Sequence, residues 1–155
     1  MRAGLCASRN RGFTLIELMV TLVVLALLLG VAVPGLQTLV AAQRMRAVSY
    51  DLVTHLMLAR SEALKRGTEV QVVPAAGGWE RGWSVRAGAT QLAHHDAPSG
   101  LDVTTAPGPI TFDLHGRVVT ADPQVRIGFT DGTRSRCISL DPAGRPKTLQ
   151  EECPA

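Results

Sequence analysis

The apolar residues of this chain follow three successive patterns. From Phe13 to Val33 they form an almost unbroken run, and from Leu36 to Ala63 they recur at steps of three and four residues. From Thr68 onward they alternate with polar residues in short stretches. An unbroken run is typical of a membrane-spanning helix, steps of three and four of an amphipathic helix, and alternation of β-strands. The chain is therefore predicted to hold an anchor, a helix that continues it, and a β-rich head.

The amphipathic stretch predicts a helix with one buried face. Its apolar positions are Leu36, Leu39, Val40, Val48, Leu52, Leu56, Ala59 and Ala63. Pro34 and Gly35 predict a kink or local melting, because proline lacks a backbone donor and clashes with the preceding turn. Gly67 is expected to end the helix, and Lys65 and Arg66 suit the negative end of the helix dipole.

The alternating region predicts a mostly antiparallel sheet. Strands are expected around Val70 and Val72, Trp83 and Val85, Ile110 to Leu114, Val125 to Phe129, and Ile138 to Leu140. Asp131-Gly132 predicts a hairpin, and His115-Gly116 and Ala143-Gly144 predict turns. Residues 75–81 and 94–109, rich in Gly, Ala, Pro and Ser, are expected to be surface loops. We expect the sheet to bury one face against the amphipathic helix.

One acidic residue stands inside the apolar run. No lysine or arginine lies between Phe13 and Gln43 to accompany Glu17. A charge within lipid costs about 2.5–3.5 kcal/mol by insertion scales, so such a residue is by default functional and has a partner. That partner must come from another chain or be created by processing.

Two simpler interpretations of the run remain open. About 20 residues span a bilayer, so Phe13 to Val33 could be an ordinary anchor or an uncleaved signal anchor. Arg2, Arg9 and Arg11 would then hold the N-terminus inside. A secretory signal peptide fits less well, because its apolar core is shorter and Pro34-Gly35 interrupts the position of a cleavage site.

The sequence Gly12-Phe13-Thr14-Leu15-Ile16-Glu17 resembles the processing site of type IV pilins and type II secretion pseudopilins. The resemblance implies that prepilin peptidase cuts between Gly12 and Phe13 on the cytoplasmic side and N-methylates Phe13. Residues 1–12 would be the leader, 13–33 the transmembrane helix, 34–67 its amphipathic continuation and 68–155 the periplasmic head. The new amine of a neighbouring subunit would neutralise Glu17 and set the register of assembly.

Within that superfamily the chain resembles the GspH/FimT group. The resemblance rests on residues 59–67, Trp79 with Gly82-Trp83, Ile110–Asp113 with Gly116-Arg117, and Cys137–Leu140 with Gly144-Arg145. It implies an α+β, pilin-like fold, in which a long N-terminal helix packs on a mostly antiparallel head. It also implies a minor filament subunit in the inner membrane. FimT-like members serve type IV pili, some of which support DNA uptake; GspH-like members serve the type II secretion pseudopilus, and both remain open.

Composition fits a small anchored module. The length of 155 residues allows one domain beside the anchor. The formal charge of +3 comes from 16 basic and 13 acidic residues. Because three of the basic residues lie in the expected leader, the mature chain carries 13 charges of each sign. Any basic patch for nucleic acid must therefore be local.

The implied cleavage changes the cysteine count. It would remove Cys6 and leave Cys137 and Cys153 as an even pair on the exported side, where disulfides persist. A bridge between them would stabilise the head by about 3 kcal/mol through loop entropy. Two free thiols are the alternative. Cys6 does not suggest a lipoprotein, because it precedes the apolar run.

The C-terminal region offers a candidate contact with double-stranded DNA. Gly144-Arg145-Pro146-Lys147 resembles the DNA-contacting loop of FimT-like minor pilins. A disulfide could bring Arg134 and Arg136 near this loop, and phosphate binding needs such clustering. Glu151 and Glu152 in the same loop, and the lack of a later aromatic residue to stack on bases, favour a solvated polar edge instead.

Catalytic and metal chemistry find little support. Adjacent strand residues point to opposite faces, so His94-His95-Asp96 does not form a closed metal shell. Asp113 with His115, or Ser139 with Asp141, could be parts of a catalytic set. The sequence has no nucleophile elbow or phosphate loop that would complete either pair. We expect no enzyme activity, metal site or cofactor, and we expect Trp79 and Trp83 to cap the sheet core.

Overall fold

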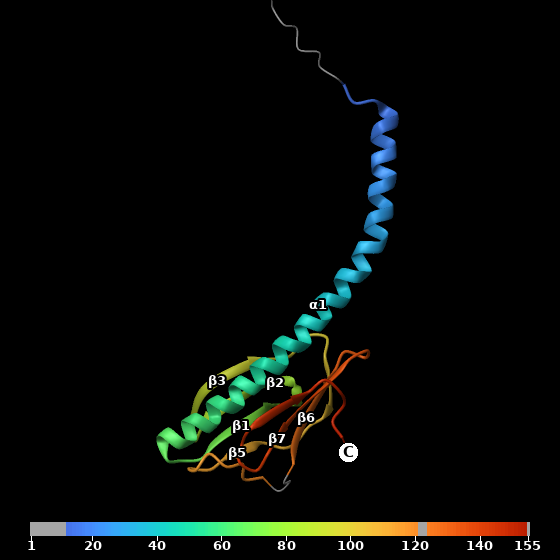
Figure 1. The fold of residues 1–155 in the computed structure, drawn as a ribbon. Coiled ribbons are helices and arrows are strands. Elements are labelled where there is room, and N and C mark those ends of the chain that lie inside the picture. Colours follow the sequence, from blue (N-terminus) through green and yellow to red (C-terminus); the bar gives the residue numbers. More distant parts are fainter. Residues whose placement is uncertain (1–11, 121–123, 155) are drawn as a thin grey trace, which may run out of the picture. The chain divides into compact units, whose positions relative to one another are not determined.

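The computed structural model describes residues 12–120 and 124–154 (Figure 1). Cys6 and the leader arginines Arg2, Arg9 and Arg11 lie outside these residues. The chain divides into two compact units, Met1–Leu39 and Val40–Ala155, and helix α1 (Leu15–Arg66) contributes to both.

The first unit is helical from Leu15 onward. The backbone stays helical through Pro34 and Gly35, so the expected local melting is not observed. Its side chains are exposed throughout the described part, as the 63% exposure of Leu36 and Leu39 illustrates. The prediction that Leu36, Leu39 and Val40 belong to the buried face is therefore wrong.

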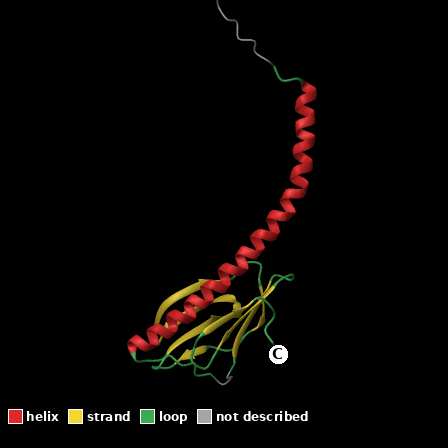
Figure 2. Cartoon of the chain, in the orientation of Figure 1, coloured by secondary structure: helices red, strands yellow, loops and turns green. Residues whose placement is uncertain are grey.

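The second unit contains two four-stranded antiparallel sheets where the sequence predicted one (Figure 2). Sheet A has the order β3-β2-β1-β5 and sheet B the order β4-β6-β7-β8. The strands of sheet A are β1 (Val70–Ala75), β2 (Gly78–Ala87), β3 (Thr90–Asp96) and β5 (Ile110–Phe112). Those of sheet B are β4 (Asp102–Thr105), β6 (Val125–Thr130), β7 (Ser135–Leu140) and β8 (Pro146–Leu149).

The five expected strands are present, but β3, β4 and β8 lie where no strand was predicted. The expected loop at 75–81 is largely the β1–β2 hairpin, and the expected loop at 94–109 contains the end of β3 and all of β4. The three unpredicted strands are edge strands. They bury few side chains, so their sequences lack the apolar alternation that marks a half-buried strand.

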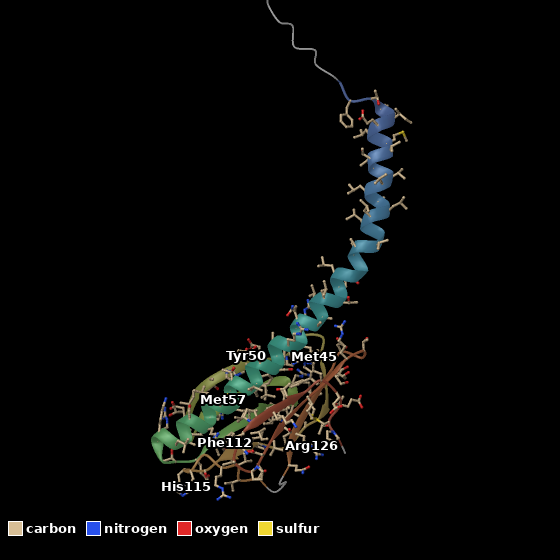
Figure 3. All side chains as sticks on the ribbon, viewed as in Figure 1. Met45, Tyr50, Met57, Phe112, His115 and Arg126 are labelled. Atoms are coloured by element: carbon tan, nitrogen blue, oxygen red, sulfur yellow. A yellow bond between two sulfur atoms is a disulfide. The ribbon has the colours of Figure 1, made fainter. Side chains whose placement is uncertain are left out.

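One hydrophobic core joins α1 to both sheets. The buried positions of α1 are Met45, Val48, Leu52, Leu56, Ala59 and Ala63. Tyr50 and Met57, on the other side of the helix, are exposed by 72% and 58% (Figure 3). Trp79 and Trp83 were expected to cap the core, and both are almost completely buried within it. The helix thus packs on the sheets through one face, as its apolar spacing predicts from Val48 onward.

Candidate functional site

The start of α1 has a defined cap. The Glu17 backbone N–H donates to Thr14 Oγ1 at 3.2 Å, and the Leu18 N–H donates to the Thr14 carbonyl at 3.2 Å. Thr14 is therefore the N-cap and Glu17 the third helical residue. Thr-x-x-Glu is the capping-box pattern, a local signal in the sequence that could have predicted this helix start. The carboxylate lies in the first turn, where the helix dipole favours negative charge.

The segment after this cap is apolar and uncovered. Among the described residues, α1 is long and apolar enough to cross a membrane, with a mean hydropathy of 2.7 over a window of which none is buried. Gly12 and Phe13, the expected processing pair, directly precede the cap, and Phe13 is 72% exposed. An apolar surface of this extent requires lipid or another protein chain to cover it.

The structure contains the disulfide expected between Cys137 and Cys153, with an S–S distance of 2.05 Å. Cys137 is fully buried in β7, and Cys153 lies in the segment that follows β8. The bridge therefore fastens the C-terminal segment to sheet B. Nearby, a Cβ atom on Gly128 would come within 3.4 Å of Cys153 Sγ, so glycine leaves room for this segment.

A groove of about 490 Å³ opens on the outer face of sheet B. Three basic side chains line it: Arg126 of β6, Arg145 of the β7–β8 turn and Lys147 of β8. Arg126 and Lys147 share a face because both pair with Ser139 across neighbouring strands. Strands lie about 4.8 Å apart, so the Cα atoms of these two residues are about 10 Å apart.

The structure separates the other two candidate cations from this groove. Arg136 pairs with the buried Phe129, three residues along β7 from Ser139, and an odd spacing puts it on the opposite face. Arg134 lies in the β6–β7 hairpin, where its N–H donates to Asp131 Oδ1 at 2.6 Å. The idea that a disulfide brings all four cations together is therefore wrong. The disulfide joins β7 to the C-terminal segment, and Arg136 stays on the face of β7 opposite the groove.

Arg126 is the third basic residue of the groove, although it was not among the four cations predicted from the sequence. Its Nη1 donates to the Pro154 carbonyl at 2.5 Å, and its Nη2 donates to Gln124 Oε1. The C-terminal segment thus lies against the Arg126 side chain. In the sequence Arg126 is one polar residue of an alternating strand. Arg126 and Lys147 share a face only because each pairs with Ser139, and no local sequence pattern predicts that register.

Asp141 orients Arg145 at the rim of the groove. Its Oδ1 accepts the Arg145 backbone N–H at 2.9 Å, and its Oδ2 accepts the Arg145 Nε at 2.7 Å. The backbone hydrogen bond from Arg145, followed by the side-chain bond, lowers the pKa of Asp141. The Arg145 side chain is nevertheless 74% exposed. Because the carboxylate engages Nε, this bond leaves the two terminal nitrogens of the exposed side chain available to a ligand.

The two histidines considered as metal ligands have other roles. The His95 ring stacks on Trp83 with centroids 4.1 Å apart, and its Nε2 lies 3.2 Å from Asp51 Oδ2. His94 Nε2 lies 3.2 Å from Asp96 Oδ1 at the surface. Over the described ranges, no three His, Cys, Asp or Glu residues form a group suited to a metal ion.

The family model described as "Type II transport protein GspH" matches residues 49–144, which is more than half of the chain. The chain belongs to the GspH family. A second model, described as "Prokaryotic N-terminal methylation motif", matches residues 7–33 and includes Gly12, Phe13 and Glu17. Among curated proteins, none matches the chain significantly.

Solved structures share the fold of this GspH-family chain. Two crystal structures of the type IV minor pilin FimU of Pseudomonas aeruginosa strain PAO1 superpose with TM-scores of 0.59 and 0.57. The first is 22% identical, covering 72% of this chain and 96% of FimU; the second is 23% identical, covering 67% and 91%. The chain therefore has the α+β, pilin-like fold that its sequence resemblance implied.

Family membership and the methylation motif together define the protein as a pilin-like subunit. Such a subunit is processed by prepilin peptidase and assembles with other pilins. The apolar N-terminal helix is consistent with a membrane-anchored component of a pilus or pseudopilus.

Proposed function

We propose that this protein is a FimT-like minor pilin, a non-enzymatic structural subunit of a type IV pilus. The supporting observation is an apolar, uncovered helix, capped by Thr14 and with Glu17 in its first turn, in a chain of the GspH family. Both FimU structures with this fold are type IV minor pilins, which favours the pilus over the pseudopilus. A GspH-like pseudopilin of the type II secretion system is the alternative.

The N-terminal segment supplies the assembly chemistry. Prepilin peptidase removes residues 1–12 and N-methylates Phe13, which leaves a cationic amine two residues before α1. The helix crosses the inner membrane with the head in the periplasm. During assembly, Glu17 pairs with the Phe13 amine of a neighbouring subunit. A charge in lipid is costly, so only the subunit position that pairs the two groups is favourable.

A Glu17→Gln variant tests this role. In cells that carry prepilin peptidase and the partner pilins, we expect mass spectrometry to find the mature Phe13 end in both proteins. We expect the variant to be depleted more than about tenfold from sheared filaments, since about 1.4 kcal/mol is a tenfold change in an equilibrium. Glu69→Gln in the head is the matched control.

Three outcomes decide the proposal. Wild-type filament levels of Glu17→Gln would refute the pairing of Glu17 with the amine. Recovery of the wild-type chain only with secretion pseudopilins, and never with sheared pili, would establish the alternative system. Retention of residues 1–12 in the mature protein would contradict both pilin assignments.

A second candidate function is contact with double-stranded DNA. The specific observation is the groove in which Arg126, Arg145 and Lys147 meet. Clustered cations release counterions from neighbouring phosphates, which scattered cations do not. Three prolines also line the groove: Pro142, Pro146 and Pro154.

Charge reversal tests the DNA contact. We expect Arg145→Glu with Lys147→Glu to abolish binding of duplex DNA by the full-length chain in detergent. We also expect wild-type affinity to fall steeply between about 50 and 200 mM salt. Fluorescence anisotropy measures both, and unchanged binding by the double variant would remove this groove from consideration.

A further inference from the structure

Two turns of the head have the same sequence pattern and share two hydrogen bonds donated by backbone N–H groups. They are Asp113-Leu114-His115-Gly116-Arg117 and Asp141-Pro142-Ala143-Gly144-Arg145. In each, the arginine N–H donates to the aspartate Oδ1, at 2.8 Å and 2.9 Å. In each, the glycine N–H donates to the aspartate carbonyl at 2.8 Å. The glycines adopt φ values of +69° and +73°, which few other residues tolerate. Each turn therefore ends by presenting an arginine.

The two turns lie directly against each other. A Cβ atom on Gly144 would come within 2.7 Å of the Gly116 carbonyl oxygen, and the Val118 N–H donates to the Pro142 carbonyl at 3.2 Å. Arg117 and Arg145 each follow one of the two touching glycines. Arg60 of α1 fixes the first turn, because its Nε donates to the Gly116 carbonyl at 3.0 Å. The contact thus brings two exposed arginines to one edge of the head.

Each turn has one carboxylate and one guanidinium, so its net charge is zero. Whether a turn attracts phosphate therefore depends on which of the two groups is exposed. Both carboxylates accept backbone N–H groups, and Asp141 Oδ2 also accepts the Arg145 Nε at 2.7 Å. Asp113 Oδ1 accepts the N–H groups of His115 and Arg117, and these backbone bonds, led by that of Arg117, lower the pKa of Asp113. Arg117 and Arg145 are both exposed, and Arg145 lines the groove together with Lys147 and Arg126. Cationic donors therefore continue from Arg117 past Arg145 into the groove.

We propose that the paired Asp-x-x-Gly-Arg turns form one phosphate-binding edge, in which Arg117 extends the basic groove and contacts the backbone of double-stranded DNA. This inference rests on the DNA-binding candidate function described above. It assigns a new contact residue, Arg117, on a loop separated from the C-terminal region in sequence. It also assigns Asp113 and Asp141 as positioning residues that fix the backbone of the two turns.

The test compares single arginine variants of the full-length chain in detergent. Arg117→Gln and Arg145→Gln keep the backbone bond of each turn, because the arginine N–H donates it, although Arg145→Gln also removes the bond from Arg145 Nε to Asp141. Arg86→Gln, exposed on β2 of sheet A, is the matched control. The probe is a fluorescein-labelled duplex of mixed sequence, titrated by anisotropy from about 50 to 200 mM salt. Near-UV circular dichroism of every variant verifies the fold.

Loss of one phosphate contact lowers the slope of log affinity against log salt by about 0.9 and, at about 0.1 M salt, weakens binding by about five- to tenfold. We expect this change for Arg117→Gln and Arg145→Gln, and their combination should lower the slope by about 1.8. Arg86→Gln should bind like wild type.

The outcomes separate this inference from the candidate function beneath it. If Arg145→Gln weakens binding while Arg117→Gln matches Arg86→Gln, the paired edge is refuted and the DNA contact of the groove remains. If the wild-type chain does not bind the duplex, or if neither variant changes the slope, both are refuted. Equal weakening by all three variants would show a diffuse charge effect and would also overturn the edge.

Discussion

The indole of Trp83 contacts side chains of α1 and β3. Its Nε1 donates to His55 Nδ1 of α1 at 2.8 Å, and His95 of β3 stacks on its ring. Because Trp83 is fully buried, its N–H needs an acceptor, and only an unprotonated Nδ1 can serve. Burial, followed by the nearby His95, lowers the pKa of His55 from 6.5; His94 acts in the same direction and Asp51 opposes them. This hydrogen bond and the lowered pKa of His55 together predict that the stability of the head depends on pH.

We expect acid to destabilise the head through His55. Its folded pKa lies below the unfolded value of 6.5, so the unfolded chain binds the proton first as pH falls. The stabilisation is complete above pH 6.5 and declines as the pH falls toward the folded pKa. His55→Gln offers an oxygen acceptor that does not titrate in this range. Its thermal midpoint should therefore fall less than that of wild type between about pH 8 and about pH 5.5.

Differential scanning fluorimetry across this range measures the two slopes. His115→Gln, at an exposed turn, is the control for a histidine outside the cluster and should keep the wild-type slope. An equal loss for wild type and His55→Gln would mean that the acid sensitivity arises elsewhere.

Among the elements of the head, the docking of the two arginine turns depends on glycine at position 144. A Cβ atom there would lie 2.7 Å from the Gly116 oxygen and 2.9 Å from Phe112 Cε1. Gly132 in the β6–β7 hairpin has a similar φ, +83° against +73°, but nothing lies within 4 Å of its Cβ position. The two glycines therefore have the same left-handed backbone conformation, and only Gly144 has atoms close to its Cβ position.

Gly144→Ala should therefore cost more stability than Gly132→Ala. We expect about 1 kcal/mol for Gly132→Ala, from the left-handed backbone alone, and more than about 3 kcal/mol for Gly144→Ala. Urea denaturation of the two variants gives the difference in the free energy of unfolding. Equal losses would show that the turns can separate without cost.

The elements also show which sequence patterns suffice for prediction. Strands β1, β6 and β7 bury apolar residues at every second position, with Gly128 and Cys137 buried as well, and apolar alternation located them. Edge strands β3, β4 and β8 bury little, so no such alternation marks them. The start of the buried helix face was placed at Leu36 instead of Met45, because apolar spacing cannot say whether lipid, a partner or the sheets will cover a residue.

In the molecule as a whole, the hydrophobic core belongs entirely to the second unit. Its first residue along the chain is Met45, and the unit begins at Val40. The core joins α1 to both sheets, while the described residues before Val40 contribute nothing to it. The stability of the head should therefore not depend on the anchor.

We expect a fragment comprising Val40–Ala155 to fold in water without detergent. Removal of the preceding helix leaves uncapped N–H groups, which should cost no more than about 1 kcal/mol. Its near-UV circular dichroism should match that of the full-length chain in detergent, while the fragment should be absent from filaments. Loss of the near-UV signal would show that the anchor is part of the folding unit.

Features that depend on neighbours along the chain were predictable from the residues alone. The apolar run, the motif from Gly12 to Glu17, the helix end at Gly67 and the turns at Gly116 and Gly144 all follow from local composition and backbone preference. The family resemblance followed from the same residues, and the matching family model confirms it.

Which charged side chains meet depends instead on contacts between distant parts of the chain. Strand register places Arg126 beside Lys147 and turns Arg136 to the other face, and the contact of Gly116 with Gly144 brings Arg117 to Arg145. These pairs are set by hydrogen bonds between strands and loops far apart in sequence. The side-chain period of a strand is two, so a shift of one residue in pairing would have reversed every face.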